Sequence, residues 1–217
     1  MLKVIAFDLA WAGKIGWARL SWGAGRYTHF ETGIIKPYYR VDKPVYQAKR
    51  AAGIVDELLL VLRSNHVAAY DRVVFAYETP LHWLLSASKR KKRKGPPVTR
   101  NSLLGMAFAV NCFHVAMGQY LSGCGRDGKD WFDVRAVDTQ TARSAFGVHD
   151  LTALAQPRIR ELAALPGYAD AKKACVGAAL EIRLQHEGLG GLAIETDHEA
   201  DAGVFAFYVA DEEILRM

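Results

Sequence analysis

Residues 2–35 contain three short strand-like stretches: the first is apolar, and the second and third alternate apolar and polar residues. The stretches at 2–9, 14–22 and 26–35 are rich in β-branched, aromatic and other apolar side chains, and GAG at 23–25 separates the second from the third. Alternation with a period of two residues is typical of strands joined by hairpins. The pattern therefore predicts three consecutive antiparallel strands.

The rest of the chain alternates helical and strand-like segments. Helical spacing of apolar residues at 45–64 and 101–121 is followed in each case by a strand-like stretch, at 72–78 and 131–138. Further helices are expected near 139–146, 157–164 and 169–186 and from about 197 to 213, with a glycine-rich break at 187–191. This order predicts an α/β protein with a mixed five-stranded sheet and helices on both faces, which is the topology of the ribonuclease H-like fold.

Length and composition indicate a globular protein with an ordinary core. The chain has 217 residues, of which 51% are hydrophobic and 24% charged, so we expect residues 1–217 to form a single domain. Cys112, Cys124 and Cys175 form no CxxC pair, which favours reduced thiols and a cytoplasmic protein. Neither a signal peptide nor an apolar run of membrane-spanning length is recognised, so no membrane partner is expected.

Positive charge is concentrated in one segment. The formal net charge is +5, yet without KRKKRK at 89–94 the chain has 22 basic and 23 acidic residues. GPP at 95–97 disfavours regular structure, so we expect a basic, flexible loop at about 86–100. Such a loop on a nearly neutral body suits a polyanion such as DNA, although a merely solvated loop is the common alternative. The expected DNA-binding cations are Lys89, Arg90, Lys91, Lys92, Arg93, Lys94 and Arg100.

Acidic side chains stand at three separated places where apolar segments end or begin. Asp8 ends the first predicted strand, Glu78 ends the fourth, and residues 195–201 place four acids and His198 directly before the apolar part of the last helix. A carboxylate at the end of a buried strand is costly unless a partner neutralises it. In the predicted topology the ends of the first and fourth strands lie beside the start of the last helix, so we expect these groups to meet.

Spacing within the last segment indicates which side chains share a direction. His198 and Asp201 are three residues apart, and Asp197 and Asp201 are four apart, so either pair lies on one face of a helix. Gathered carboxylates repel one another unless a cation neutralises them, and hard oxygen ligands favour Mg²⁺ or Mn²⁺. Two such ions about 3.5–4 Å apart form the clamp used in phosphodiester hydrolysis. The alternative is structural, because acids at a helix N-terminus also favour capping and the helix dipole.

Four short motifs, taken in order, resemble the RuvC family of Holliday junction resolvases. They are IAFDLAWAGKIGWARL at 5–20, FAYETP at 75–80, RNSLLGMAFAV at 100–110 and DHEADA at 197–202. The resemblance implies a homodimeric, Mg²⁺-dependent endonuclease of DNA recombination and repair that nicks four-way junctions, with the third motif in the dimer interface. The catalytic and metal-binding residues that it implies are Asp8, Glu78, His198 and Asp201, with Asp197 as a competing ligand.

The resemblance also suggests roles for three other side chains. ADAKKACV at 169–176 implies a catalytic Lys173 that stabilises charge on the phosphate or the leaving oxygen, although Lys172 is an equal contender by sequence. Arg143 stands where the family often has a basic residue and is expected to contact a phosphate. Trp83 follows the second acid and is a candidate for stacking on an exposed base, with a core position as the alternative.

Two segments depart from the family pattern. The stretch at 79–100 is longer and more basic, and 146–168 is also longer than usual. These departures leave the preferred cleavage sequence open and point to a version carried by a phage or mobile element, acting in the host cytoplasm. Another nuclease of the same fold, acting on flaps, other branched DNA or RNA–DNA hybrids, and a non-catalytic DNA-binding module remain alternative functions.

Overall fold

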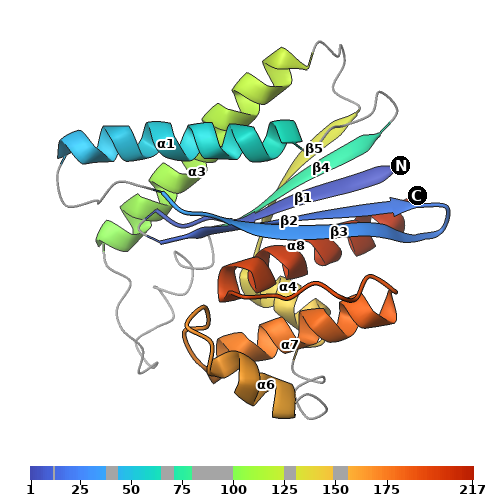
Figure 1. The fold of residues 1–217 in the computed structure, drawn as a ribbon. Helices are drawn as coiled ribbons and strands as arrows, with labels where there is room; N and C mark the ends of the chain where they lie inside the picture. The colour runs from blue at the N-terminus through green and yellow to red at the C-terminus, as the bar shows by residue number, and fades with distance from the viewer. Residues whose placement is uncertain (12, 38–43, 65–70, 80–99, 125–130, 149–155) are drawn as a thin grey trace.

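The computed structural model describes residues 1–11, 13–37, 44–64, 71–79, 100–124, 131–148 and 156–217. A central sheet lies between two groups of helices (Figure 1). Its strand order is β3-β2-β1-β4-β5, with β1–β2 and β2–β3 antiparallel and β1–β4 and β4–β5 parallel. The strands are β1 (Leu2–Asp8), β2 (Ile15–Gly23), β3 (Arg26–Ile35), β4 (Arg72–Glu78) and β5 (Phe132–Val137). The predicted mixed five-stranded sheet is confirmed.

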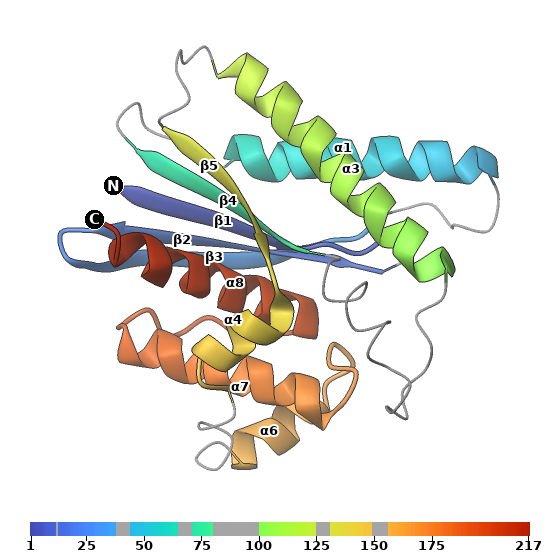
Figure 2. The same ribbon diagram turned by 180° about the vertical axis from the view of Figure 1, so that it is seen from behind.

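Helices cover both faces of this sheet, and the two views in Figures 1 and 2 agree on their distribution. On one face lie α1 (Pro44–Ser64) and α3 (Arg100–Gly123). On the other face lies α8 (Asp197–Ile214), with α4 (Thr139–Ala145), α7 (Ala171–His186) and α6 (Gln156–Ala163) beyond it. None of the helices in the described ranges is long and apolar enough to cross a membrane.

The period of two residues in β1 divides the core into two layers. Leu2, Val4 and Ala6 belong to the cluster shared with α7 and α8, whereas Ile5 and Phe7 belong to the cluster shared with α1 and α3. All five are almost fully buried, which explains why this strand is apolar on both faces. Asp8 continues the alternation and therefore faces α8.

Helix α8 is buried along most of its length because it lies between the sheet and α7. Phe205 and Phe207 are fully buried, and Gly203 lies against Leu180 of α7 so closely that an added Cβ would overlap that side chain. The abrupt apolar run after residue 201 is thus the buried body of a central helix. This burial holds the charged first turn of α8 at one end of the sheet, beside the ends of β1 and β4.

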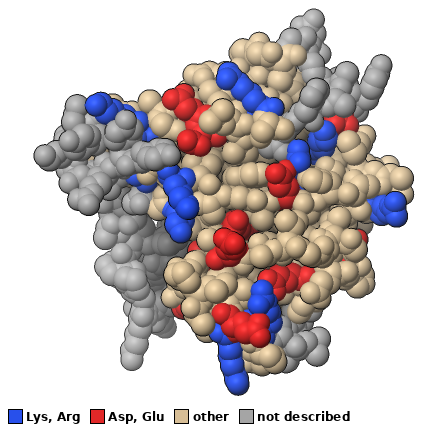
Figure 3. Space-filling view, in the orientation of Figure 1, with Lys and Arg blue, Asp and Glu red and all other residues tan. Residues whose placement is uncertain are grey.

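The predicted and observed element boundaries agree closely, with small differences that have local causes. Helix α7 begins at Ala171, after the expected start at 169, because the carboxylate of Asp170 accepts a hydrogen bond from the backbone N–H of Lys173 (2.8 Å) and caps the helix. Most of the predicted basic loop, including 89–94, and Trp83 lie outside the described residues, whereas Arg100 is the first residue of α3. On the face seen in Figure 3, acidic and basic side chains of the described residues are interspersed.

Candidate active site

Sheet register brings Asp8 and Glu78 together. β1 and β4 are parallel and pair Phe7 with Tyr77, so the next residues, Asp8 and Glu78, lie side by side at the ends of the two strands. Both face α8, because they continue the alternation of Ala6 and its partner on β4, which lie in the α8 core. Asp8 is 7% exposed. Two carboxylates at neighbouring strand ends therefore point to the same side of the sheet.

The first turn of α8 reaches Asp8 because β2 carries a glycine at the crossing. Gly16 pairs with Asp8 in the sheet, and a Cβ at this position would overlap the carbonyl oxygen of His198. The close approach lets the imidazole of His198 contact Asp8, with Nδ1 2.6 Å from Oδ2. Because Gly16 has no side chain, the start of α8 can approach the end of β1 closely enough for this contact.

Asp201 lies one turn further along α8 and is paired with two cations. Its carboxylate is 2% exposed and accepts hydrogen bonds from Arg143 Nε (2.9 Å) and Arg143 Nη2 (2.6 Å to each oxygen). Lys173 Nζ donates to Oδ2 of the same group at 2.8 Å and lies 3.8 Å from Oδ2 of Asp197. The ammonium of Lys173, rather than that of Lys172, is therefore the one that meets Asp201.

Burial and neighbouring carboxylates raise the pKa of Glu78 and of Asp8. Burial and the charge of Asp8 raise the pKa of Glu78 to about 8, although its carboxylate accepts a hydrogen bond from the Thr139 hydroxyl (2.5 Å). Burial also raises the pKa of Asp8; the hydrogen bond with His198 lowers it, and the charge of Asp201 raises it further. The charge of Asp201 acts on both Glu78 and Asp8, so carboxylates from β1, β4 and α8 lie close together.

The pKa values of the two basic partners, His198 and Lys173, are raised as well. The hydrogen bond to Asp8 raises the pKa of His198, despite its partial burial. Burial alone would lower the pKa of Lys173, but the charge and hydrogen bond of Asp201 raise it above its usual value. Each cation is thus stabilised by a carboxylate of the site, and the site is a compact network of opposite charges.

Part of the acidic segment before the last helix has a structural role. Thr196 is the N-cap of α8, and its hydroxyl accepts a hydrogen bond from the backbone N–H of Glu199. The Glu199 carboxylate in turn accepts from the Thr196 hydroxyl (3.0 Å) and from the backbone N–H of Glu195 (3.2 Å). This reciprocal capping gives Glu199 a structural role at the start of α8. Asp197, His198 and Asp201 instead contact the other charged residues of the candidate site.

The donor chemistry of the site suits a divalent cation. Asp8, Glu78 and Asp201 supply carboxylate oxygens, which Mg²⁺ and Mn²⁺ prefer. Among the described residues, no group of three or more His, Cys, Asp or Glu side chains is arranged as a metal-binding cluster. The carboxylate of Asp201 is paired with Arg143 and Lys173, and that of Asp8 with the imidazole of His198. A divalent cation bound here would neutralise the carboxylates of Asp8 and Asp201, which His198, Arg143 and Lys173 neutralise in this structure.

Two contributors to the site were not anticipated from the sequence. Thr139 begins α4, and only the N-cap Asp138 separates it from the end of β5. Because Glu78 pairs with Val137 in the sheet, the Thr139 hydroxyl lies close enough to donate a hydrogen bond to the Glu78 carboxylate. Gly16 lies within the first motif, at 5–20, where the sequence assigned it no role of its own. A small residue opposite Asp8 in the predicted hairpin was the available signal for its role. The hydroxyl of Thr139 had no comparable signal, because its partner depends on which strand lies beside β4.

Comparison with solved structures identifies the fold of the chain. No protein-family model matches the chain, and no curated protein matches its sequence. Among solved structures, Thermus thermophilus RuvC in complex with a Holliday junction substrate is similar, with a TM-score of 0.55 and 12% identity over 98% of this chain and 96% of that one. A second Thermus thermophilus RuvC structure has a TM-score of 0.54 and 15% identity, covering 99% and 96%. The chain therefore has the RuvC-type, ribonuclease H-like fold.

Proposed function

We propose that this protein is a divalent-metal-dependent endonuclease that cuts branched DNA, with four-way junctions as its principal substrate. The observation that carries the proposal is the convergence of Asp8, Glu78 and Asp201 from three distant segments, beside two cations, in a fold like that of RuvC. One of the similar RuvC structures contains a Holliday junction substrate, which favours branched DNA over other polyanions.

The residues that would hold Mg²⁺ are Asp8, Glu78 and Asp201, with Asp197 or His198 as a further ligand. When bound there, the ion supplies Lewis acidity that activates water for attack on phosphorus and stabilises the departing 3′ oxygen. Arg143 and Lys173 now neutralise Asp201, and once that charge is taken over they are placed to pair with the phosphate. His198 orients the Asp8 carboxylate through its Nδ1 contact.

We infer that the active protein is a homodimer that uses α3. Leu104, Phe108 and Val115 of this helix are 47%, 47% and 50% exposed, and their spacing places them along one helical face. Large apolar residues on one exposed helical face are typical of a protein–protein contact. A two-fold dimer would present two sites to a two-fold symmetric junction.

The proposed function is tested with one panel of labelled substrates at a single salt concentration: four-way junction, flap, linear duplex and RNA–DNA hybrid. We expect paired nicks in opposing strands of the junction in the presence of Mg²⁺ or Mn²⁺, and none after chelation. Light scattering of wild type and Phe108→Glu tests the dimer in parallel. Tight binding without cleavage under any metal condition would instead identify a DNA-binding module, and preferential cutting of the hybrid would identify a different nuclease.

A further inference from the structure

The segment between β1 and β2 borders the candidate active site; the structure describes its residues 9–11, 13 and 14. This β1–β2 segment follows Asp8 directly. Gly13 within it lies beside His198, since a Cβ added at Gly13 would be 3.9 Å from Nε2 of the imidazole. The other ring nitrogen of His198, Nδ1, lies 2.6 Å from the Asp8 carboxylate. The imidazole therefore lies between the carboxylate of Asp8 and the backbone that continues from it.

Arg50 of α1 holds the β1–β2 segment from the face of the sheet opposite α8 (Figures 1 and 2). Its guanidinium donates hydrogen bonds from Nε to the carbonyl oxygen of Trp11 (2.5 Å) and from Nη2 to that of Gly13 (3.4 Å). Arg50 is 5% exposed, and a buried guanidinium is costly unless its N–H groups are hydrogen-bonded. Because the guanidinium is rigid and planar, it also fixes the two carbonyl oxygens relative to each other.

Side chains of the same segment are anchored in the α1–α3 layer. Leu9 is 2% exposed and belongs to the core shared with α1 and α3. The ring of Trp11 lies 5.3 Å from that of Phe108, measured between centroids, and 5.8 Å from Cζ of Arg50. Gly105 of α3 allows this approach, because a Cβ there would lie 3.2 Å from Cβ of Trp11. The contacts that hold the β1–β2 segment thus come from helices that carry none of the proposed metal ligands.

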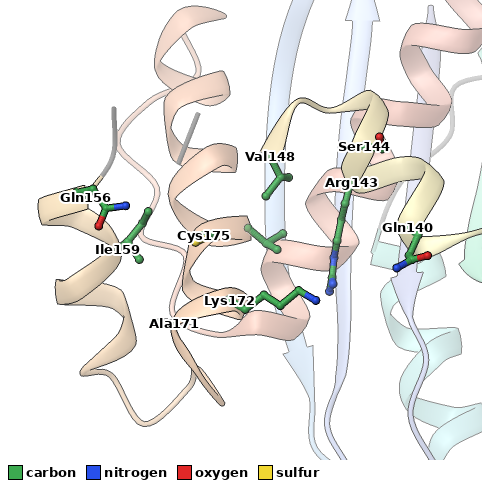
Figure 4. Close-up of a pocket in the computed structure, with 10 residues that line it drawn as sticks. Gln140, Arg143, Ser144, Val148, Gln156, Ile159, Ala171, Lys172 and Cys175 are labelled. Carbon is green, nitrogen blue, oxygen red and sulfur yellow. The ribbon is translucent and has the colours of Figure 1, made fainter. Parts of the chain in front are cut away.

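The other half of the site is held by cations on the α8 side of the sheet. Arg143 extends from α4 toward Lys172 of α7 across a pocket of about 650 Å³ that these helices line (Figure 4). The Arg143 guanidinium and the Lys173 ammonium pair with the carboxylate of Asp201. These contacts hold Asp201, whereas Arg50 holds the segment that begins after Asp8.

We propose that Arg50 is a positioning residue of the active site, which fixes the β1–β2 segment and thereby the orientation of the Asp8 carboxylate. By holding two carbonyl oxygens of the segment, it keeps that carboxylate beside His198 and Glu78. The inference rests on the proposed function. Residues that orient metal ligands typically change metal affinity about 10–100-fold when they are removed, although they do not contact the metal themselves.

The test measures metal binding and cleavage separately. Calorimetric titration of the metal-free protein with Mn²⁺, without DNA, gives the metal affinity. Arg50→Met removes the hydrogen-bond donors and keeps a long side chain, so we expect Mn²⁺ affinity to fall about tenfold or more. The Mg²⁺ concentration for half-maximal single-turnover cleavage of a four-way junction should rise by a similar factor. Arg63→Met, the same change at an exposed position of α1, is the matched control and should alter neither quantity.

A conservative variant keeps the inference testable if Arg50→Met does not fold. Arg50→Lys retains the charge but replaces the planar fork with a single ammonium, so we expect a loss of several-fold in Mn²⁺ affinity, smaller than that of Arg50→Met. A purely structural role would lower the urea concentration at the unfolding midpoint and leave the metal affinity of the folded protein unchanged. Wild-type Mn²⁺ affinity in a folded variant of either kind would therefore overturn the inference.

Failure of the proposed function gives a different result. A wild-type protein that binds Mn²⁺ but cuts no DNA would overturn the proposed function alone, because the effect of Arg50→Met on Mn²⁺ affinity would still decide the role of Arg50. A wild-type protein that binds no Mn²⁺ and cuts no DNA would overturn both.

Discussion

The imidazole of His198 lies 2.6 Å from the carboxylate of Asp8, measured from Nδ1 to Oδ2, although 190 positions separate the two residues in the chain. The contact joins the first turn of the last helix to the end of the first strand, and Gly16 makes the approach sterically possible. It also raises the pKa of His198, which favours the imidazolium beside a carboxylate. A charge pair between residues far apart in sequence thus holds the first turn of α8 against the end of β1.

Asp8 and Glu78 are expected to be required for cleavage and dispensable for DNA binding. Asp8→Asn and Glu78→Gln preserve side-chain size but remove the negative charge that a divalent ion needs, so cleavage of a four-way junction should fall on the order of 100-fold or more. Affinity in a gel-shift assay without divalent metal should stay within a few-fold of wild type. Cleavage at the wild-type rate in either variant would contradict the assigned ligands.

Lys173 and Lys172 are adjacent in the chain and provide a matched pair. Lys173→Ala removes a cation that lies 2.8 Å from Asp201 and should reduce the cleavage rate about 100-fold, because it takes away charge stabilisation at the phosphate. Lys172→Ala removes an equal charge that does not contact Asp201 and should affect the rate much less. Single-turnover cleavage at saturating enzyme distinguishes the two, and equal losses would indicate a general electrostatic effect.

Glu78 should make the stability of the metal-free protein depend on pH. Because its pKa is raised from 4.5 to about 8 in the folded state, the folded protein binds the proton more tightly than the unfolded chain. The free energy of unfolding therefore falls as pH rises between these values, by up to about 1.4 kcal/mol per pH unit for one proton. Urea denaturation of wild type and Glu78→Gln between about pH 5 and pH 8 isolates the effect.

The wild type should lose stability relative to Glu78→Gln across that interval, and saturating Mg²⁺ should reduce the loss because the bound ion replaces the proton. Stability curves that run parallel for the two proteins would show that folding does not raise the pKa of Glu78.

Gly16 should be intolerant of even the smallest side chain. Gly16→Ala places a methyl group against the carbonyl oxygen of His198, so we expect a loss of about 1–3 kcal/mol in the free energy of unfolding and a large loss of cleavage. Gly53→Ala in α1 is the control, because no atom lies within 4 Å of the added methyl and the change should be neutral or stabilising. Denaturant unfolding measures both, and similar effects would argue against the steric explanation.

Deleting 89–94 should weaken DNA binding in a manner independent of sequence. If all six cations contact phosphates, the slope of log affinity against log salt concentration should become shallower by up to about 5. Measuring affinity for a junction at several salt concentrations gives this slope directly. An unchanged slope would show that the segment does not contact the DNA phosphates.

The sequence by itself determined the order and type of the elements and the two strand-end acids. Alternation of apolar residues with period two identifies β2 and β3, whereas short continuous apolar runs identify β1 and β4. The apolar run after residue 201 indicates a buried helix, as α8 is. Asp8 and Glu78 could be assigned to one place because parallel strands end at the same edge of a sheet. These inferences need only local periodicity and topology.

Only the tertiary structure decided which side chains are partners. The sequence could not separate Lys172 from Lys173, nor assign Glu199 to a cap, nor place Thr139 on Glu78. A turn of helix spans about 5.4 Å, whereas a hydrogen bond requires its two heavy atoms to lie within about 3 Å. The rotation of each helix against the sheet therefore determines which of two neighbouring residues makes contact, and that rotation is set by packing across the whole core.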